Sequence, residues 1–382
     1  MSARASTAPT EQTAGNDAEP LLDVEDLRTH FLTPRGRVRA VDGVTLTVRK
    51  GTALGVVGES GSGKTIFARS IMNLLPQENV VRSGRITFAG RELMDLDSKQ
   101  MRKLSGVELA MVFQDPMSSL NPVMTIGKQI TEPLRQHLRM GRGEAWETAV
   151  ALLRSTNIPE PERRFDEYPH QLSGGMRQRV MIALALACGP RLLFADEPTT
   201  ALDVTVQAEI LNLLQDQQND RQMAMVLVTH DLGVVAGRTD EIAVMYAGRI
   251  VEQAPTKVLF SRMRHPYTEA LLRSIPRVEN PSHTRLRVIV GRPPDLVDPP
   301  DGCPFAARCP YVHDRCLVEE PPLVDPGGDG HRFACHAPLG TPENAAALEA
   351  NLERRLPQSM VLLDAPSGPP DTSAAMMGPD AG

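Results

Sequence analysis

Gly58-Glu-Ser-Gly-Ser-Gly-Lys64-Thr65 is a full match to the loop pattern G-x-x-x-x-G-K-[ST]. The apolar run Ala53–Val57 precedes it and Ile66–Met72 follows it, so the local order is strand, loop, helix. In that order the glycines let backbone N–H groups face phosphate oxygens, and the helix N-terminus adds positive potential. The alternative, a glycine-rich turn without a ligand, is disfavoured by the full match in this setting. We therefore expect a nucleoside triphosphate to bind along Gly58, Glu59, Ser60, Gly61, Ser62, Gly63, Lys64 and Thr65.

The last two residues of the loop have separate predicted tasks. Lys64 would reach the β- and γ-phosphates as a point charge. Thr65 would offer its hydroxyl to Mg²⁺.

A second glycine-containing stretch is Leu172-Ser-Gly-Gly-Met-Arg-Gln-Arg179, at the start of the apolar helical segment Ser173–Ala187. Gly174 and Gly175 fall in the first turn, where glycine lowers helix stability. That cost is explained if the helix N-terminus, with Ser173, must approach a phosphate closely.

Polar residues end three further apolar segments. Arg191–Glu197 is a buried-type strand ending in two acids, of which Asp196 can hold Mg²⁺ and Glu197 can act as general base toward a water. His230 follows the strand Met223–Thr229, at the edge of a parallel sheet where ligands bind. Gln114, after an apolar strand, could be a strand cap or could reach a metal ion and a water. The other motifs of this chain favour the second role.

The composition narrows the functional classes. With 382 residues and a net charge of -6, the chain has an ordinary soluble composition, and we expect no nucleic-acid partner. It contains no run of 18 apolar residues, and residues 1–19 lack the apolar region of a signal peptide. Association with a membrane would therefore have to go through another protein.

The pattern along the chain predicts several elements. Leu21–Val48 alternates like strands around a turn at Pro34–Gly36, which predicts an antiparallel layer. Helices are expected at Leu93–Leu104, Ile126–Leu138, Glu144–Thr156 and Ser173–Ala187, and again at Val204–Gln218 with Asp203 as N-cap. Phe31, beside the early turn, could stack on an adenine ring or could simply be a core or loop aromatic.

These motifs together resemble the ATP-binding subunit of an ABC transporter over about Leu21 to Pro266. GESGSGKT resembles Walker A, LSGGMRQR the ABC signature and LLFADE Walker B, with Glu197 as catalytic base. Gln114 resembles the Q-loop, Asp203 the D-loop and His230 the H-loop, whereas Phe31 would be the A-loop aromatic. Met176 departs from the Gln of many relatives, but the adjacent Arg177-Gln178-Arg179 is intact.

The resemblance implies a mechanism in which two such domains enclose two ATP molecules. Ser173, Gly174, Gly175 and Asp203 would then complete the partner's site. Catalysis would rest on Glu197, His230 and Gln114, with Mg²⁺ held by Thr65, Gln114 and Asp196. The resemblance favours a paralogous ATPase as partner. It also implies two transmembrane permease subunits, an extracytoplasmic solute-binding protein and a place on the cytoplasmic face of the plasma (inner) membrane.

The C-terminal part narrows the resemblance further. Arg264–Leu272 and Gly302–Pro310, together with Gln114–Pro122, resemble oligopeptide/dipeptide permease ATPases. This implies import of peptides, or alternatively of nickel or another small solute. An exporter subunit and a soluble ABC ATPase of DNA repair or translation are further alternatives. The single Walker A, the acidic charge and the lack of a heptad run weigh against the soluble ATPase.

Cys303, Cys309, Cys316 and Cys335 follow the pattern C-x5-C-x6-C-x18-C in a Pro- and Gly-rich segment. This segment has too little apolar pattern for a core of its own, so a metal or cross-link is expected. Four thiolates suit zinc or an iron–sulfur cluster. The family resemblance implies a [4Fe–4S] cluster, with Zn²⁺ as the alternative and unliganded or disulfide-linked thiols as the remainder.

We thus predict an α/β fold with an ABC-type P-loop NTPase core, an antiparallel β layer, a helical subdomain and a small Cys-containing C-terminal extension. The predicted divisions are a disordered leader at 1–19 and an ATPase domain at 20–260 with its helical subdomain at about 116–190. The extension would follow at 261–340, and a mostly disordered tail at 341–382.

Overall fold

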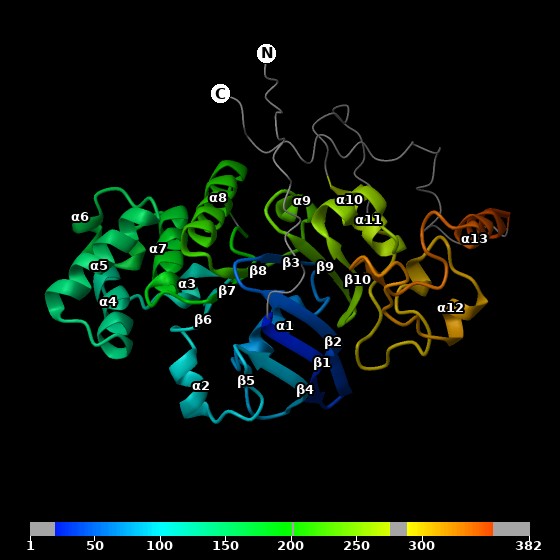
Figure 1. Ribbon diagram of the computed structural model, residues 1–382, viewed down its shortest axis with the longest axis horizontal. Helices are drawn as coiled ribbons and strands as arrows, with labels where there is room; N and C mark the ends of the chain where they lie inside the picture. Colours follow the sequence, from blue (N-terminus) through cyan, green and yellow to red (C-terminus); the bar gives the residue numbers. More distant parts are fainter. Residues whose placement is uncertain (1–19, 201, 276–288, 354–382) are drawn as a thin grey trace, which may run out of the picture.

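A computed structural model describes residues 20–200, 202–275 and 289–353 (Figure 1). The predicted disorder of residues 1–19 and of the end of the chain from residue 354 lies outside the described residues. The first part of the predicted tail forms the helix α13 (Pro342–Glu353).

A seven-stranded sheet with the order β11-β10-β9-β3-β8-β7-β6 forms the centre. Its strands are β3 (Ala53–Val57), β6 (Leu109–Val112), β7 (Leu192–Asp196), β8 (Ala224–Thr229), β9 (Glu241–Tyr246), β10 (Arg249–Pro255) and β11 (Arg332–Phe333). From β9 to β6 neighbouring strands are parallel, whereas β10 and β11 are antiparallel to their neighbours. The parallel strands are apolar along most of their length because both faces of the sheet are covered. In β7, for example, Leu193 packs into one core cluster and Phe194 into the other.

A second, antiparallel sheet has the order β2-β1-β4-β5 and confirms the predicted layer before the loop. Its strands are β1 (Pro20–Thr33), β2 (Gly36–Arg49), β4 (Val80–Phe88) and β5 (Arg91–Glu92). The helix α1 (Lys64–Ile71) shares a core with this sheet: Phe67 and Ile71 belong to the same buried cluster as Leu22. The loop before α1 is therefore held by a rigid framework.

Helices form a third region, at the left of Figure 1, as predicted for residues 116 to about 190. They are α3 (Pro116–Ser119), α4 (Ile126–His137), α5 (Arg142–Ser155), α6 (Pro161–Phe165) and α7 (Gly174–Leu186), with a short 3-10 turn at Pro169–Gln171. Ile130 of α4, Leu153 of α5 and Val180 of α7 are fully buried in one cluster. The three long helices confirm the predictions to within two residues at each end.

One predicted helix is too long. The helix expected at Leu93–Leu104 begins only at Ser98, as α2 (Ser98–Leu104). Asp97 accepts hydrogen bonds from the N–H groups of Lys99 and Gln100, and the Gln100 side chain accepts one from the Asp97 N–H. This capping box fixes Asp97 as the N-cap and Ser98 as the first helical residue. Arg91–Glu92, just before the predicted helix, pairs with β4.

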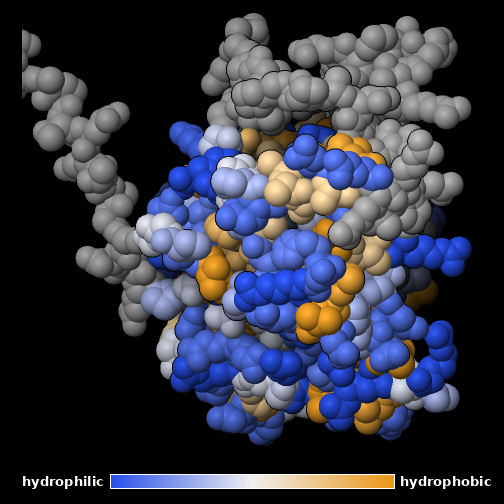
Figure 2. Space-filling model, turned by 90° about the vertical axis from the view of Figure 1, so that its right-hand side faces the viewer, coloured by the Kyte–Doolittle hydropathy of each residue, from blue (hydrophilic) through white to orange (hydrophobic). Residues whose placement is uncertain are grey.

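The remaining helices close the ATPase core and lead into the C-terminal extension. They are α8 (Val204–Arg221), α9 (Leu232–Val235), α10 (Thr256–Arg262), α11 (Pro266–Ser274) and α12 (Asp314–Val318), with a 3-10 turn at Ala306–Arg308. The extension adds β11 to the edge of the central sheet, pairing Phe333 with Glu252. In the view of Figure 2, the described surface is mainly hydrophilic, with apolar residues in small separate patches.

Candidate functional site

The loop Gly58–Thr65 joins the end of β3 to the start of α1, as predicted. Gly63 is the N-cap of α1, with φ +103°, a conformation that L side chains rarely adopt. A Cβ at Gly58 would lie 2.1 Å from the carbonyl oxygen of Met245, and one at Gly63 would lie 2.2 Å from that of Ala40. The loop therefore packs too closely on its neighbours for any side chain at these two glycines.

Lys64 lies folded across the loop. Its Nζ donates hydrogen bonds to the carbonyl oxygens of Gly58, at 2.7 Å, and Glu59, at 2.9 Å. Burial lowers the pKa of Lys64, and the nearby acids Glu197, Asp196 and Glu59 only partly oppose that shift. The ammonium group is thus positioned inside the loop where phosphates are expected.

Thr65 and Asp196 come together from α1 and β7. Thr65 Oγ1 donates a hydrogen bond of 2.9 Å to Asp196 Oδ1. Asp196 Oδ2 is buried and has no hydrogen-bond partner. Burial raises the pKa of Asp196, although the bond from Thr65 and the charge of Arg69 act in the other direction. A hydroxyl beside a carboxylate with one unsatisfied buried oxygen is a donor set that suits Mg²⁺.

Three predicted catalytic residues meet at one carboxylate. Gln114 Nε2 donates to Glu197 Oε2 at 3.2 Å, and His230 Nδ1 lies 3.4 Å from the same oxygen. The Glu197 backbone has φ +46°, a strained conformation of the kind found at functional sites. Glu197 lies mostly within the protein, whereas the His230 side chain is 57% exposed and can turn toward a ligand.

Thr200 is a member of this group that the sequence analysis did not single out. Its Oγ1 donates a hydrogen bond of 2.9 Å to Glu197 Oε2. The only sequence signal was its position three residues after the acid, on the same turn.

The signature residues lie elsewhere. Ser173 caps α7 by accepting a hydrogen bond from the Met176 N–H, and Gly174 and Gly175 open the helix. Asp203 caps α8 through the N–H of Val206, as predicted. Figure 1 shows α7 in the helical region and well apart from α1. Ser173, Gly174 and Gly175 are therefore not brought to the loop of their own chain.

Phe31 lies near the end of β1, opposite Val38 of β2 and Val80 of β4, and is half-buried. Its stacking on a base stays a prediction.

Two residues of the C-terminal part, Tyr267 and Arg308, contact the loop at Glu59 and were not predicted.

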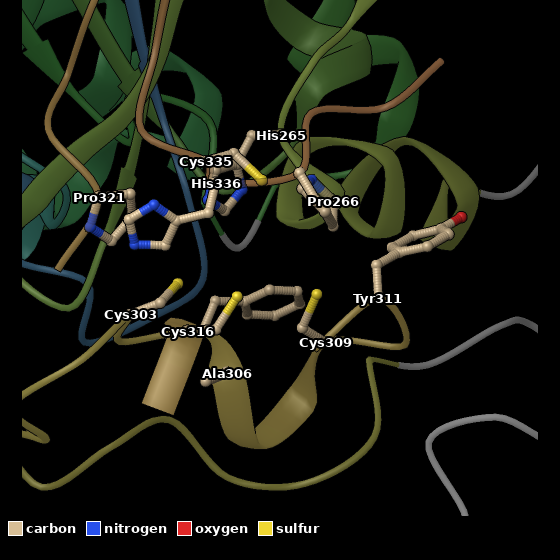
Figure 3. Close-up of a pocket in the computed structure, with 12 residues that line it drawn as sticks. His265, Pro266, Cys303, Ala306, Cys309, Tyr311, Cys316, Pro321, Cys335 and His336 are labelled. Atoms are coloured by element: carbon tan, nitrogen blue, oxygen red, sulfur yellow. The ribbon is translucent and has the colours of Figure 1, made fainter. Parts of the chain in front are cut away.

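The four cysteines of the extension line one pocket, and their sulfur atoms face the same space from two sides (Figure 3). All four are free thiols. Burial raises the pKa of Cys303 to about 11 and that of Cys335 to about 12, and it also raises the pKa of Cys309 and Cys316. Among the described residues, no group of three His, Cys, Asp or Glu side chains is placed to hold a metal ion. The metal predicted at these cysteines stays a prediction.

The phosphate loop lies between a strand and a helix, and the acid pair stands at the end of another strand of the same parallel sheet. With the capped glycine helix in a separate helical region, they define a P-loop NTPase of the ABC type.

Comparisons with known proteins agree with this class. Residues 41–200 match the ABC transporter family, and residues 251–316 match the oligopeptide/dipeptide transporter C-terminal region. The dipeptide transport ATP-binding protein DppD of Escherichia coli is 47% identical over 319 residues, which cover 84% of this chain and 97% of that protein. The oligopeptide transport ATP-binding protein OppD of Bacillus subtilis is 49% identical over 304 residues, which cover 79% of this chain and 85% of that protein.

Among solved structures, the chain is similar to a dimeric ATP-binding cassette in a post-hydrolysis state, bound to ADP and Pi. The alignment covers 62% of this chain and 98% of that one. Its TM-score is 0.56 and its identity is 28%.

This chain belongs to the ATP-binding subunits of ABC transporters, in the oligopeptide/dipeptide branch. It is an ATPase coupled to transport. Within the described residues, no helix is long and apolar enough to cross a membrane.

Proposed function

We propose that this chain is the ATP-hydrolysing subunit that powers an importer of di- and oligopeptides. The observation that carries the substrate class is the oligopeptide/dipeptide C-terminal region at residues 251–316, continuous with the ATPase core. The names of DppD and OppD, which align over most of their length, point to the same solutes. Nickel or another small solute is the alternative. Purification of the tagged chain with its membrane partners, followed by uptake assays with a dipeptide and with nickel, separates the two.

The nucleotide would lie along Gly58–Thr65, with backbone N–H groups and Lys64 on its phosphates. Lys64 would exchange the carbonyl oxygens of Gly58 and Glu59 for phosphate oxygens. Thr65 and Asp196 would hold Mg²⁺, with Gln114 nearby, since Asp196 Oδ2 lacks a partner. When bound, Mg²⁺ neutralises charge that develops on the phosphates. Phe31 would stack on the base.

Glu197 would act as general base on the attacking water. Its carboxylate is oriented by Gln114, Thr200 and His230, so that the free oxygen can accept a proton from the water. The exposed His230 side chain can turn toward the γ-phosphate.

The active unit would contain two ATPase subunits. Ser173, Gly174 and Gly175 open α7, which lies apart from the loop of its own chain, so a partner is needed to combine both parts in one site. Asp203 would join them from the start of α8. The related solved cassette is a dimer with ADP and Pi, which supports this arrangement. ATP would add contacts that exist only in the closed pair and would so shift its population. A paralogue is the proposed partner.

The further proposed partners are two transmembrane permease subunits and an extracytoplasmic solute-binding protein. Through the permease subunits the chain would work at the cytoplasmic face of the plasma (inner) membrane. Loop residues at 114–122, beside the helical region, would transmit the movement.

At the cysteines we propose a structural [4Fe–4S] cluster rather than Zn²⁺. Four cysteines from separate parts of the extension line one pocket. Zinc sites more often pair cysteines as C-x2-C, and neither short gap here, C-x5-C or C-x6-C, is that tight. Four thiolates suit a [4Fe–4S] cluster, which the resemblance to oligopeptide/dipeptide permease ATPases implies at these positions. Anaerobic purification with iron and labile-sulfide assays tests this proposal; colourless protein with stoichiometric zinc would contradict it.

A further inference from the structure

The extension reaches into the phosphate loop through one ion pair. Arg308 Nη1 donates to Glu59 Oε2 at 2.6 Å, and Arg308 Nη2 donates to Glu59 Oε1 at 2.9 Å. The two residues are 249 positions apart in sequence. This parallel pair of charge-assisted bonds is the geometry in which an arginine binds a carboxylate most specifically. The Arg308 side chain is only 2% exposed.

Arg308 is fixed on all sides. Its Nε donates to the carbonyl oxygen of Val290 and its Nη2 to that of Ile289, each at 3.1 Å. The guanidinium lies over the rings of Tyr246, at 5.8 Å, and Phe305, at 5.9 Å. Burial lowers the pKa of Arg308, but its bonds to Glu59 and Tyr246 outweigh that effect, so it stays charged.

Glu59 is also held through its backbone. Its N–H donates to the hydroxyl of Tyr267 at 2.8 Å, and its carbonyl oxygen accepts a bond from Lys64. Tyr267 in turn packs on Tyr246, with ring centroids 4.5 Å apart. One loop residue thus connects the C-terminal part of the chain to the lysine of the loop.

The charge of Glu59 needs an explanation, because the loop is built to receive phosphates. A carboxylate near the phosphates would repel them, and repulsion is stronger in a partly buried site than in water. Arg308 supplies the opposite charge directly on that carboxylate. The pair is therefore neutral where a lone Glu59 would oppose nucleotide binding.

We propose that Arg308 is a positioning residue of the ATP site: it neutralises the Glu59 carboxylate, while the Tyr267 hydroxyl holds the Glu59 backbone in the shape that receives phosphates. The Cys-containing extension thereby completes the ATP site of its own chain. This inference rests on the proposed role of Gly58–Thr65 as the nucleotide loop.

The test is calorimetric titration of the purified full-length chain with Mg²⁺–ADP, which is not turned over. Arg308→Gln should weaken binding by about tenfold or more, as expected when a buried charge-assisted pair is broken. The ratio of its Kd to that of the wild type should shrink at high salt, because screening shortens from about 10 Å at 0.1 M to about 3 Å at 1 M. Arg315→Gln is the matched control: it breaks an exposed ion pair with Glu319 in the same extension and should bind normally.

Substitution of Glu59 separates charge compensation from mere packing. Glu59→Gln breaks the same ion pair but leaves a positive Arg308, so binding should be unchanged or tighter. The double variant Arg308→Gln/Glu59→Gln should recover most of the affinity lost in Arg308→Gln. If Arg308→Gln does not fold, Glu59→Gln still decides the matter, because a purely structural pair predicts weaker binding for it.

Three results would overturn the inference: normal binding by folded Arg308→Gln, binding weakened more than about threefold by Glu59→Gln, or no recovery in the double variant. Lys64→Ala tests the underlying proposal separately. If Lys64→Ala binds nucleotide normally, the loop is not the nucleotide site. If Lys64→Ala abolishes binding while the Arg308 variants behave as wild type, only the inference about Arg308 fails.

Discussion

Thr65 Oγ1 donates a hydrogen bond of 2.9 Å to Asp196 Oδ1, which joins the first turn of α1 to the end of β7. The other oxygen of Asp196 is buried without a partner. In the proposed site this pair would supply two ligands to Mg²⁺, and it links the phosphate loop to the strand that Glu197 follows.

Mg²⁺ binding should be sensitive to acid through Asp196. Burial raises the pKa of this carboxyl, so it takes up a proton at a higher pH than an exposed aspartate. Since Mg²⁺ requires the carboxylate form, Mg²⁺ affinity should fall on acidification from a pH above the usual aspartate range. Titration of Mg²⁺ into the ADP complex at a series of pH values measures this. ADP affinity without Mg²⁺ is the control and should not follow the same curve; an unchanged Mg²⁺ affinity down to pH 4 would contradict the assignment.

Glu197→Gln should retain ATP binding and lose turnover. The amide cannot accept the proton of the attacking water, and loss of a general base lowers the rate by about 10²- to 10⁴-fold. The variant should also accumulate the closed ATPase pair, measured by size-exclusion chromatography with ATP. Glu162→Gln, at an exposed ion pair with Arg154, is the control. Near-normal hydrolysis by Glu197→Gln would refute the role of Glu197.

Thr200→Val should lower kcat and leave KM for ATP nearly unchanged. The variant removes one hydrogen bond to the Glu197 carboxylate, so the base is less well oriented. A bond to a charged group contributes enough for about a tenfold effect. Steady-state ATPase kinetics provide the measurement, with Thr33→Val at the exposed turn between β1 and β2 as control. A raised KM with unchanged kcat would show that Thr200 acts on binding instead.

Phe31→Ala should weaken ATP binding by about tenfold, the effect expected for loss of one base–aromatic contact. Phe31→Tyr keeps a ring and should bind normally. Inorganic tripolyphosphate, which has no base, should bind equally to all three proteins. If Phe31→Ala weakens tripolyphosphate as much as ATP, Phe31 supports the loop and does not stack on the base.

Much of the site could be predicted because its parts follow strand ends. Gln114, Glu197 and His230 come after β6, β7 and β8, which are neighbours in the parallel sheet. Carboxyl ends of parallel strands meet at one edge, so their residues converge without further information. The helices at 126–137, 142–155 and 174–186 were also visible, as long segments with apolar residues between polar connectors.

The unpredicted features depend on tertiary packing, or on a local capping interaction that overrides the sequence pattern. Arg308 is one arginine in a Pro- and Cys-rich segment, and only the folded chain brings it to Glu59. Tyr267 likewise contacts the loop through packing that leaves no spacing signal. The helix predicted to begin at Leu93 was too long, because the charged, amphipathic pattern of the helix extends to residues before it. The Asp97 capping box sets the actual start.

Peptide import is tested most directly by reconstitution of the copurified complex in liposomes, with ATP and Mg²⁺ on the side of the ATPase subunits and the solute-binding protein on the other. The measurement is accumulation of a radiolabelled dipeptide against its gradient. We predict accumulation that requires ATP and is lost when this subunit carries Glu197→Gln. Accumulation that persists in that variant, or ATP-dependent accumulation of nickel without any of the dipeptide, would contradict the proposed function.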